Sequence, residues 1–431
     1  MRADVVVVGA GAAGSVVARR LAETGADVLL LEAGRDRASE RAGVLDVGPA
    51  STVITRHHAS LGDSVIELPR GRTLGGSGAV NGGYCVPARP SDVARWGPDW
   101  PRRYEVGLAR AAERLRPRLV PMSAAAARLA AAFPGRVSAV PQAREGVRRV
   151  TAFHAWDPSG AGVRVRTGAQ VRQLVWAGGL VGGRCEGVVL DDDEEVSARE
   201  VILCAGSIGT AAVLLASGLG TSTGHPVGRG VQEHPELLLD LPADDADGPE
   251  VLTSAPPRLT PLLTHVVRLG QGNGTPEVEV RPYSVPLHRA IPGLAPQPLR
   301  IGLSLMNPRG RGAIVPIRHA GGDAAAAEVR VELPEDADDR SALTDAAAVV
   351  ARRLGLVAPG AAPSMVWTTS HHLTGSARIG EVVDGAGRVL DVDGLRVADA
   401  SVLPSLPRCG PYYSVLAVAE DLAARAAAGW A

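Results

Sequence analysis

The first thirty-two residues constrain the fold of this chain more than any other feature, because they have the pattern of one complete βαβ unit. Residues 4–8, Asp-Val-Val-Val-Val, form a β-branched run that predicts a strand buried on both faces of a parallel sheet. A GxGxxG motif follows at once, and residues 15–24 then carry apolar side chains at helical spacing. Residues 26–31 indicate a second buried strand. The chain therefore opens as an α/β protein.

The glycines and the acidic residue of this unit predict a dinucleotide site. Gly9 permits the tight turn, Gly11 lets the backbone approach a pyrophosphate, and Gly14 lets the helix pack close to the sheet. The N–H groups at the start of the helix would face the phosphates. Glu32, about 20 residues further on, is expected to accept hydrogen bonds from the adenosine ribose hydroxyls. This motif alone does not separate FAD from NAD.

A second glycine-rich segment makes that distinction. Residues 70–84 contain six glycines in fifteen residues, and a loop so poor in side chains lets the backbone lie against a planar ring or a phosphate. Followed by Asp92 and Trp96, the segment resembles the glucose-methanol-choline (GMC) oxidoreductase family. In that family a stretch of the form RGxxLGGSSxxN wraps the flavin end of FAD.

The resemblance implies which residues hold the cofactor. Contacts to FAD are expected from Gly75, Gly76, Ser77, Gly78 and Asn81. Some family members carry a histidine one place before this Asn, and that histidine is covalently attached to the flavin. Val80 stands there in this chain, so noncovalent FAD is expected. Further along, Val171 matches the residue whose main chain holds the adenine in the family.

Two more segments resemble family signatures. Residues 199–220 have the pattern of a buried strand, a Gly-Ser turn and a helix, as in the second GMC signature. Residues 227–235 resemble the segment VGxNLQDHP, with Glu233 in place of Asp. We interpret His234 of this segment as a structural residue.

The candidate base lies near the C-terminus. Residues 371–380 resemble the family's HPVGTxRMG, in which a His stands three residues before the Gly, and this spacing selects His372. His371 is expected to face the other side of an extended segment. Oxidation of an alcohol needs a base for the hydroxyl proton, and an imidazole with a reference pKa near 6.5 suits neutral pH.

The last family segment returns the chain to the cofactor. Residues 394–404 resemble GLRVxDASVxP, which implies that Asp399 and Ala400 touch FAD. About ten residues later the family places a second active-site residue, His or Asn, just before the final helix. An ungapped alignment puts Tyr412 at this position, with Tyr413 beside it.

These resemblances imply a Rossmann-like FAD-binding domain with a second, substrate domain built on an antiparallel sheet. Alternating patterns predict strands of that sheet over residues 263–269, 277–285, 299–305 and 328–333, and a helix over 341–354 closed by Gly355. The FAD-binding domain is expected to comprise residues 1–100, 161–235 and 385–431. Residues 101–160 are expected to form covering helices, and residues 236–384 the substrate domain.

The composition indicates which kinds of partner to expect. A formal net charge of -1 gives no reason to expect a nucleic-acid partner, and a small molecule is the better expectation. The sequence has no lysine, which excludes Schiff-base lysine chemistry and a P-loop. The four cysteines form no CxxC motif, which indicates no metal site and a reduced, cytoplasmic protein. No apolar stretch reaches the roughly 18 to 20 residues that span a bilayer.

The sequence therefore predicts an FAD-dependent oxidoreductase that takes a hydride from the CH–OH group of an alcohol, with His372 as general base. The Asn-Gly-Gly-Tyr at residues 81–84 is similar to family members associated with the peptide-derived cofactor mycofactocin, which makes reduced mycofactocin a candidate donor. Two alternatives stay open: a hydroxynitrile lyase of the same family, and a flavin-binding module without turnover. The acceptor that reoxidises the flavin is not specified.

Overall fold

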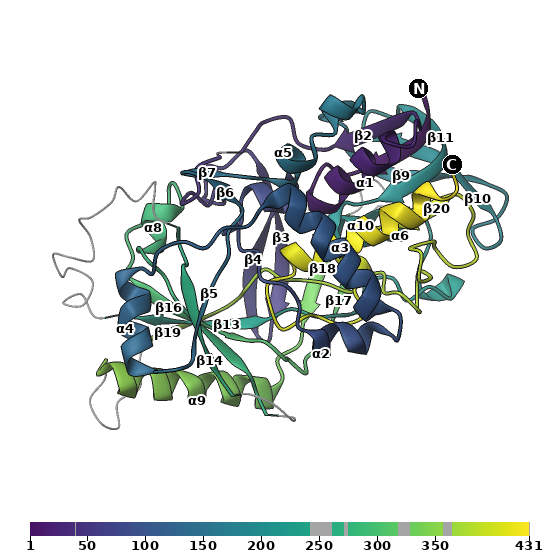
Figure 1. The fold of residues 1–431 in the computed structure, drawn as a ribbon. Helices are drawn as coiled ribbons and strands as arrows, with labels where there is room; N and C mark the ends of the chain where they lie inside the picture. The colour runs from purple at the N-terminus through teal and green to yellow at the C-terminus, as the bar shows by residue number, and fades with distance from the viewer. Residues whose placement is uncertain (39, 242–260, 271–274, 318–327, 357–363, 431) are drawn as a thin grey trace.

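The computed structural model describes all residues except 39, 242–260, 271–274, 318–327, 357–363 and 431. Figure 1 shows two regions side by side, one around β2, α1 and α10, and the other around a sheet covered by α4 and α9. The N-terminus and the C-terminus lie at the same end of the molecule, beside the first region. The chain therefore begins and ends in the same part of the fold.

The first region is built on a seven-stranded sheet in the order β8-β2-β1-β11-β10-β9, with β20 paired to β11. The strands β2, β1, β11 and β20 run parallel, and Val5, Val6 and Val7 in the centre of the sheet are fully buried. This confirms the predicted buried parallel strands. The bounds are β1 (Arg2–Val8), β2 (Val28–Glu32), β8 (Arg164–Thr167), β9 (Val171–Ala177), β10 (Arg184–Leu190), β11 (Glu195–Leu203) and β20 (Leu395–Val397).

The second region is a six-stranded sheet in the order β19-β13-β16-β15-β14-β5, antiparallel throughout. Its apolar face packs against α4 (Ala124–Ala132) and α9 (Ala337–Leu354), where Leu237, Ile301 and Val350 share one core. Three of the four predicted strands belong to it. The bounds are β5 (Val137–Ala139), β13 (Pro235–Asp240), β14 (His265–Leu269), β15 (Val278–Pro282), β16 (Arg300–Leu305) and β19 (Met365–Thr369).

The fourth predicted strand was assigned to the wrong sheet. β18 (Val329–Leu333) pairs in parallel with β3 (Ile54–Leu61) and belongs to a five-stranded sheet in the order β12-β17-β18-β3-β4. An alternating pattern shows which side chains are buried, but the pairing partner depends on distant segments. The remaining strands are β12 (Arg229–Val231), β17 (Gly312–Pro316) and β4 (Ser64–Gly71), which leads directly into the glycine-rich loop.

The helices complete the fold. α1 (Ala12–Ala22) and α3 (Trp100–Leu115) each pack against α10 (Tyr412–Ala427). α3 therefore lies on the nucleotide-binding region, although it was expected among the covering helices of residues 101–160. The domain boundaries themselves stay a prediction. The other helices are η1 (Gly76–Ala79), α2 (Pro90–Val93), η2 (Ala94–Trp96), α5 (Ala152–Trp156), η3 (Ser159–Ala161), α6 (Gly206–Ala216), η4 (Thr221–Thr223), α8 (Leu287–Ala290) and η5 (Ala400–Val402), and β6 (Arg144–Glu145) pairs with β7 (Arg148–Arg149).

Candidate active site

The three motif glycines differ in what surrounds them. A Cβ added to Gly9, which has a φ of 99°, would lie 2.6 Å from the carbonyl oxygen of Cys204, and one added to Gly14 would lie 1.8 Å from the carbonyl oxygen of Gly9. A Cβ on Gly11 would meet only the Cα of Gly76, at 3.8 Å. Packing within the protein therefore requires glycine at positions 9 and 14. Gly11 instead borders open space at the start of α1, whose first turn carries no acidic residue.

Glu32 lies at the carboxyl end of β2, where the motif predicts it. Its carboxylate accepts the N–H of Ala10 at 3.0 Å and the N–H of Gly34 at 2.9 Å, and burial raises its pKa to about 7. These two bonds leave lone pairs for ribose hydroxyls. The carbonyl of Glu32 also accepts the N–H of Ala169 at 2.9 Å, which brings the buried Val171 at the start of β9 near this end of the sheet.

The glycine-rich loop packs against the turn between β1 and α1. The N–H of Gly75 donates to the carbonyl of Ala10 at 2.8 Å, and Gly76, with a φ of 53°, would hold an added Cβ only 2.7 Å from the Cα of Gly11. Ser77 Oγ accepts the N–H of the last residue of β4 at 3.0 Å. Two segments about 65 residues apart thus form one surface of backbone atoms, which suits close approach by a phosphate or a flat ring.

The far end of the loop is fixed by side chains. Asn81 Oδ1 accepts a hydrogen bond from Arg149 Nη1 at 3.1 Å, and Val80 packs in an apolar cluster with Val53 and Ile54. Val80 therefore supplies no atom for a covalent bond to flavin. The open space at Gly11, the carboxylate of Glu32 and this backbone surface together fit FAD.

Asp399 connects two elements through its own carboxylate. Oδ2 accepts the N–H of Gly206 at 2.8 Å and the hydroxyl of Thr210 at 2.6 Å, and Oδ1 accepts both the N–H and the hydroxyl of Ser401. Burial raises the pKa of this carboxyl. The side chain is used in holding α6 against η5, so a cofactor contact by Asp399 would come from its backbone. The cofactor contacts of Asp399 and Ala400 stay predictions.

His372 is held by the histidine that we interpreted as structural. The Nδ1 atoms of His372 and His234 are 2.9 Å apart, and the two ring planes stand at 87°. One Nδ1 donates this hydrogen bond and the other accepts it, so the tautomer in which His372 Nδ1 donates leaves its Nε2 with a free lone pair. Burial, and then the neighbours His234 and Arg281, hold the pKa of His372 well below its usual value. The ring is therefore neutral at neutral pH, as a proton acceptor must be.

The expectation for His371 was wrong. This residue does not continue an extended segment, because its φ is 62°, in the left-handed region. Non-glycine residues adopt this conformation at a cost and rarely, mostly where surrounding contacts impose it. The chain therefore turns at His371, between the end of β19 and His372.

The residue that faces the imidazole of His372 is Gly410. A Cβ added there would lie 3.3 Å from His372 Nε2. Because α10 begins at Tyr412, Gly410 occupies the position just before the final helix. The Tyr412 ring lies against the glycine-rich loop, where a Cβ on Gly78 would be 2.7 Å from its Cε2. Sequence reasoning missed Gly410 because glycine offers no catalytic group, although Pro411 is typical of a helix start.

A buried charged network beside the histidines was also missed. Arg281 Nη1 donates to Glu236 Oε2 at 3.0 Å and to Ser370 Oγ at 2.8 Å, and the hydroxyl of Tyr283 donates to Glu236 Oε1 at 2.8 Å. Arg281 and Glu236 are less than 7% exposed. These residues come from β13, β15 and the end of β19, and no local motif marks them. Their proximity arises only when the six-stranded sheet forms.

Two further expectations concern metals and membranes. Within the described ranges, no group of three or more His, Cys, Asp or Glu side chains could hold a metal ion. The four cysteines are buried and unbridged. No helix among the residues that the structure describes is long and apolar enough to cross a bilayer.

Comparisons with known proteins show the family to which the chain belongs. Family models described as GMC oxidoreductase match residues 3–115 and 136–236, and residues 318–419. An uncharacterised GMC-type oxidoreductase of Rhodococcus erythropolis is 32% identical over 98% of this chain and 98% of its own. One from Mycobacterium tuberculosis is 30% identical over 98% of this chain and 75% of its own.

Solved structures share the fold. Pyridoxine 4-oxidase from Mesorbium loti superposes with a TM-score of 0.79 at 22% identity, covering 98% of each chain. A formate oxidase variant from Aspergillus oryzae gives a TM-score of 0.71 at 19% identity, covering 99% of this chain and 98% of its own. At these identities the likeness shows the fold alone. The matches of both family models and the relative aligned over the full length together show that this chain belongs to the GMC oxidoreductase family, whose members bind FAD.

Proposed function

We propose that this protein oxidises the CH–OH group of an alcohol, with His372 as the general base. The observation that carries the proposal is the imidazole of His372, which is neutral and fixed at Nδ1 by His234 while its Nε2 remains available. FAD, when bound, supplies the hydride acceptor. Loss of a hydride from carbon requires the hydroxyl proton to leave, and His372 Nε2 would receive it.

The surroundings of His372 fit a base that holds the proton only briefly. When Nδ1 of His372 donates to His234, that bond fixes both the tautomer and the orientation of the ring. Arg281 lies close enough to lower the pKa of His372, so its positive charge disfavours a long-lived imidazolium. The proton accepted from a substrate would therefore pass on readily to solvent.

Anaerobic mixing with a defined panel of alcohols tests this function. The panel comprises glucose, methanol, choline, pyridoxine and reduced mycofactocin, and the visible absorbance of the flavin is followed after mixing. We expect at least one of these alcohols to bleach the flavin, because hydride transfer removes the absorbance of the oxidised ring. If none of them does so while a cyanohydrin is cleaved with the flavin still oxidised, the protein is a lyase and the proposal fails.

Tyr412 is proposed to assist rather than to accept the proton. Burial raises the pKa of its phenol, so the hydroxyl stays protonated at neutral pH and could donate a hydrogen bond to the substrate oxygen but not take its proton. Tyr412→Phe should therefore cost about one hydrogen bond, ~0.5–1.5 kcal/mol, or about 2- to 12-fold in the rate of flavin reduction. Stopped-flow reduction of the variant measures this. A loss as large as that of His372→Ala would mean that Tyr412 has the greater role.

A further inference from the structure

The antiparallel ladder between β13 and β19 is interrupted at the histidines. Its last regular bond runs from the N–H of Ser370 to the carbonyl of His234 at 3.0 Å, and pairing resumes where Gln232 and Thr374 exchange bonds at 3.1 and 3.0 Å. One residue lies between these points on the first strand and three on the second. This is a bulge, a feature that commonly redirects a side chain beside an active site.

A bulge leaves backbone groups without their ladder partners, and Glu233 supplies the missing acceptor. The single residue on the short side of the bulge is Glu233, and its Oε1 accepts the N–H of His372 at 2.6 Å and the N–H of His234 at 2.9 Å. Glu233 is 5% exposed. A carboxylate that accepts two backbone N–H groups forms charge-assisted bonds, which are stronger than neutral ones. One carboxylate oxygen thus fixes the backbone of both histidines whose rings meet through Nδ1.

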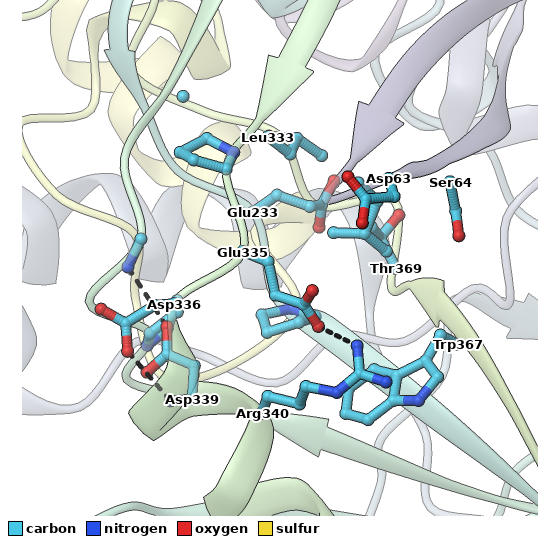
Figure 2. Close-up of a pocket in the computed structure, with 16 residues that line it drawn as sticks. Asp63, Ser64, Glu233, Leu333, Glu335, Asp336, Asp339, Arg340, Trp367 and Thr369 are labelled. Atoms are coloured by element: carbon cyan, nitrogen blue, oxygen red, sulfur yellow. Dashed lines mark hydrogen bonds and ion pairs between the residues drawn. The ribbon is translucent and has the colours of Figure 1, made fainter.

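The second oxygen of Glu233 has a different environment. Oε2 makes no hydrogen bond, and its nearest cation is Arg70 Nη2 at 3.9 Å, at the end of β4 just before the glycine-rich loop. Burial raises the pKa of Glu233 to about 7. Figure 2 shows Glu233 among the residues that line a pocket of about 280 Å³, together with Asp63 and Thr369. Burying a leucine or a glutamine at this position would cost less free energy than burying a carboxylate, so packing alone does not explain Glu233.

We propose that Glu233 is a positioning residue for the base: it holds the bulge in the conformation that presents His372 to the substrate. The inference rests on the proposed function only for the role of His372 as the base. The hydrogen bonds of Glu233 do not depend on which substrate is used. Glu233 would act through the backbone N–H of His372 and not through contact with a reacting atom. Glu233 stands where the family segment has Asp.

The first test uses a spectroscopic signal of His372 and needs no substrate. FAD-loaded protein labelled with isotopic nitrogen in histidine is studied by NMR, and the ring signal of His372 is identified as the one missing in His372→Ala. Glu233→Ala should move or broaden this signal, because two buried N–H groups lose their acceptor. Glu233→Gln keeps an oxygen in place and should shift it much less. Asp63→Asn, in the same pocket without a bond to either histidine, serves as the matched control.

The second test is a double-mutant cycle on flavin reduction by whichever panel alcohol bleaches the flavin fastest. Glu233→Ala alone should slow reduction roughly 10- to 100-fold, the range expected for removing a charged acceptor from buried donors. In the His372→Ala background the same substitution should cost nothing further, because the base on which Glu233 acts is absent.

Each outcome decides the proposal. An unchanged His372 signal in Glu233→Ala would overturn it, and so would full additivity in the cycle, which is the behaviour of a residue that only stabilises the fold. If Glu233→Ala fails to fold, Glu233→Leu takes its place, because leucine fills the same space without an acceptor oxygen, and a His372 signal and rate in Glu233→Leu identical to those of Asp63→Asn would also overturn the proposal. If no alcohol of the panel bleaches the flavin and a cyanohydrin is cleaved, the proposed function fails instead, and the NMR result still stands.

Discussion

Replacing His372 by alanine is expected to slow flavin reduction roughly 10²- to 10⁴-fold at neutral pH, the usual contribution of a general base. The imidazole of His372 is anchored at Nδ1, its other nitrogen faces Gly410, and its pKa is low enough for the ring to be neutral. Rapid mixing under anaerobic conditions measures the effect, with His371→Ala as the control from the same turn. Reduction at the wild-type rate in His372→Ala would show that another group takes the proton.

The pH dependence of the same reaction gives an independent check. A base acts in its neutral form, so the rate falls as pH falls through the pKa of the base. Burial holds the pKa of His372 well below its usual value of 6.5, so protonation of the ring itself should cause a decline in rate only below pH 6.5. A change in rate near pH 7 would instead report Glu233, whose pKa burial raises to about 7. In His372→Ala this acidic decline should be absent.

Gly11→Val is expected to give a folded protein that purifies without FAD. A valine side chain at Gly11 would not clash with the protein, because the nearest atom to an added Cβ is the Cα of Gly76 at 3.8 Å. It would instead fill the space at the start of α1 that the motif reserves for a pyrophosphate. The ratio of flavin to protein after purification, together with the circular dichroism spectrum, measures the two effects separately.

Gly14 of the same motif provides the contrast. Gly14→Val should fail to fold, because an added Cβ at that position would lie 1.8 Å from the carbonyl oxygen of Gly9, a backbone atom that cannot move aside. A yellow Gly11→Val protein with its full content of flavin would mean that this turn does not bind the phosphates. Colourless but folded protein would separate cofactor binding from the packing role of the other two glycines.

Local patterns in the sequence were sufficient for much of the nucleotide-binding region. The β-branched run of residues 4–8, the spacing of the glycines and the position of Glu32 are all features of one short stretch of chain. They predicted a strand, a helix and a second strand, and the structure has β1, α1 and β2 in that order. The helix closed by Gly355 was predicted for the same reason, since its φ of 67° suits a left-handed cap. The resemblance to the GMC family then identified His372 by its spacing from Gly375.

The strand partners and the neighbours of the histidines depend on contacts between segments far apart in the sequence. The sequence could not show that β18 pairs with β3, or that Arg281 and Glu236 meet beside the histidines, because periodicity reports which face is buried and not which strand lies next to it. Likewise, no pattern near His372 indicates that His234, 138 positions away, bonds its ring.

The bulge that presents His372 is the clearest case. It exists only because β13 and β19 are brought together in one register, and only then does Glu233 become the acceptor for an N–H group that has lost its ladder partner. Thus the sequence by itself determined the nucleotide-binding unit and the identity of the candidate base. The tertiary structure alone decided how that base is held, since the groups that hold it are neighbours in space and not along the chain.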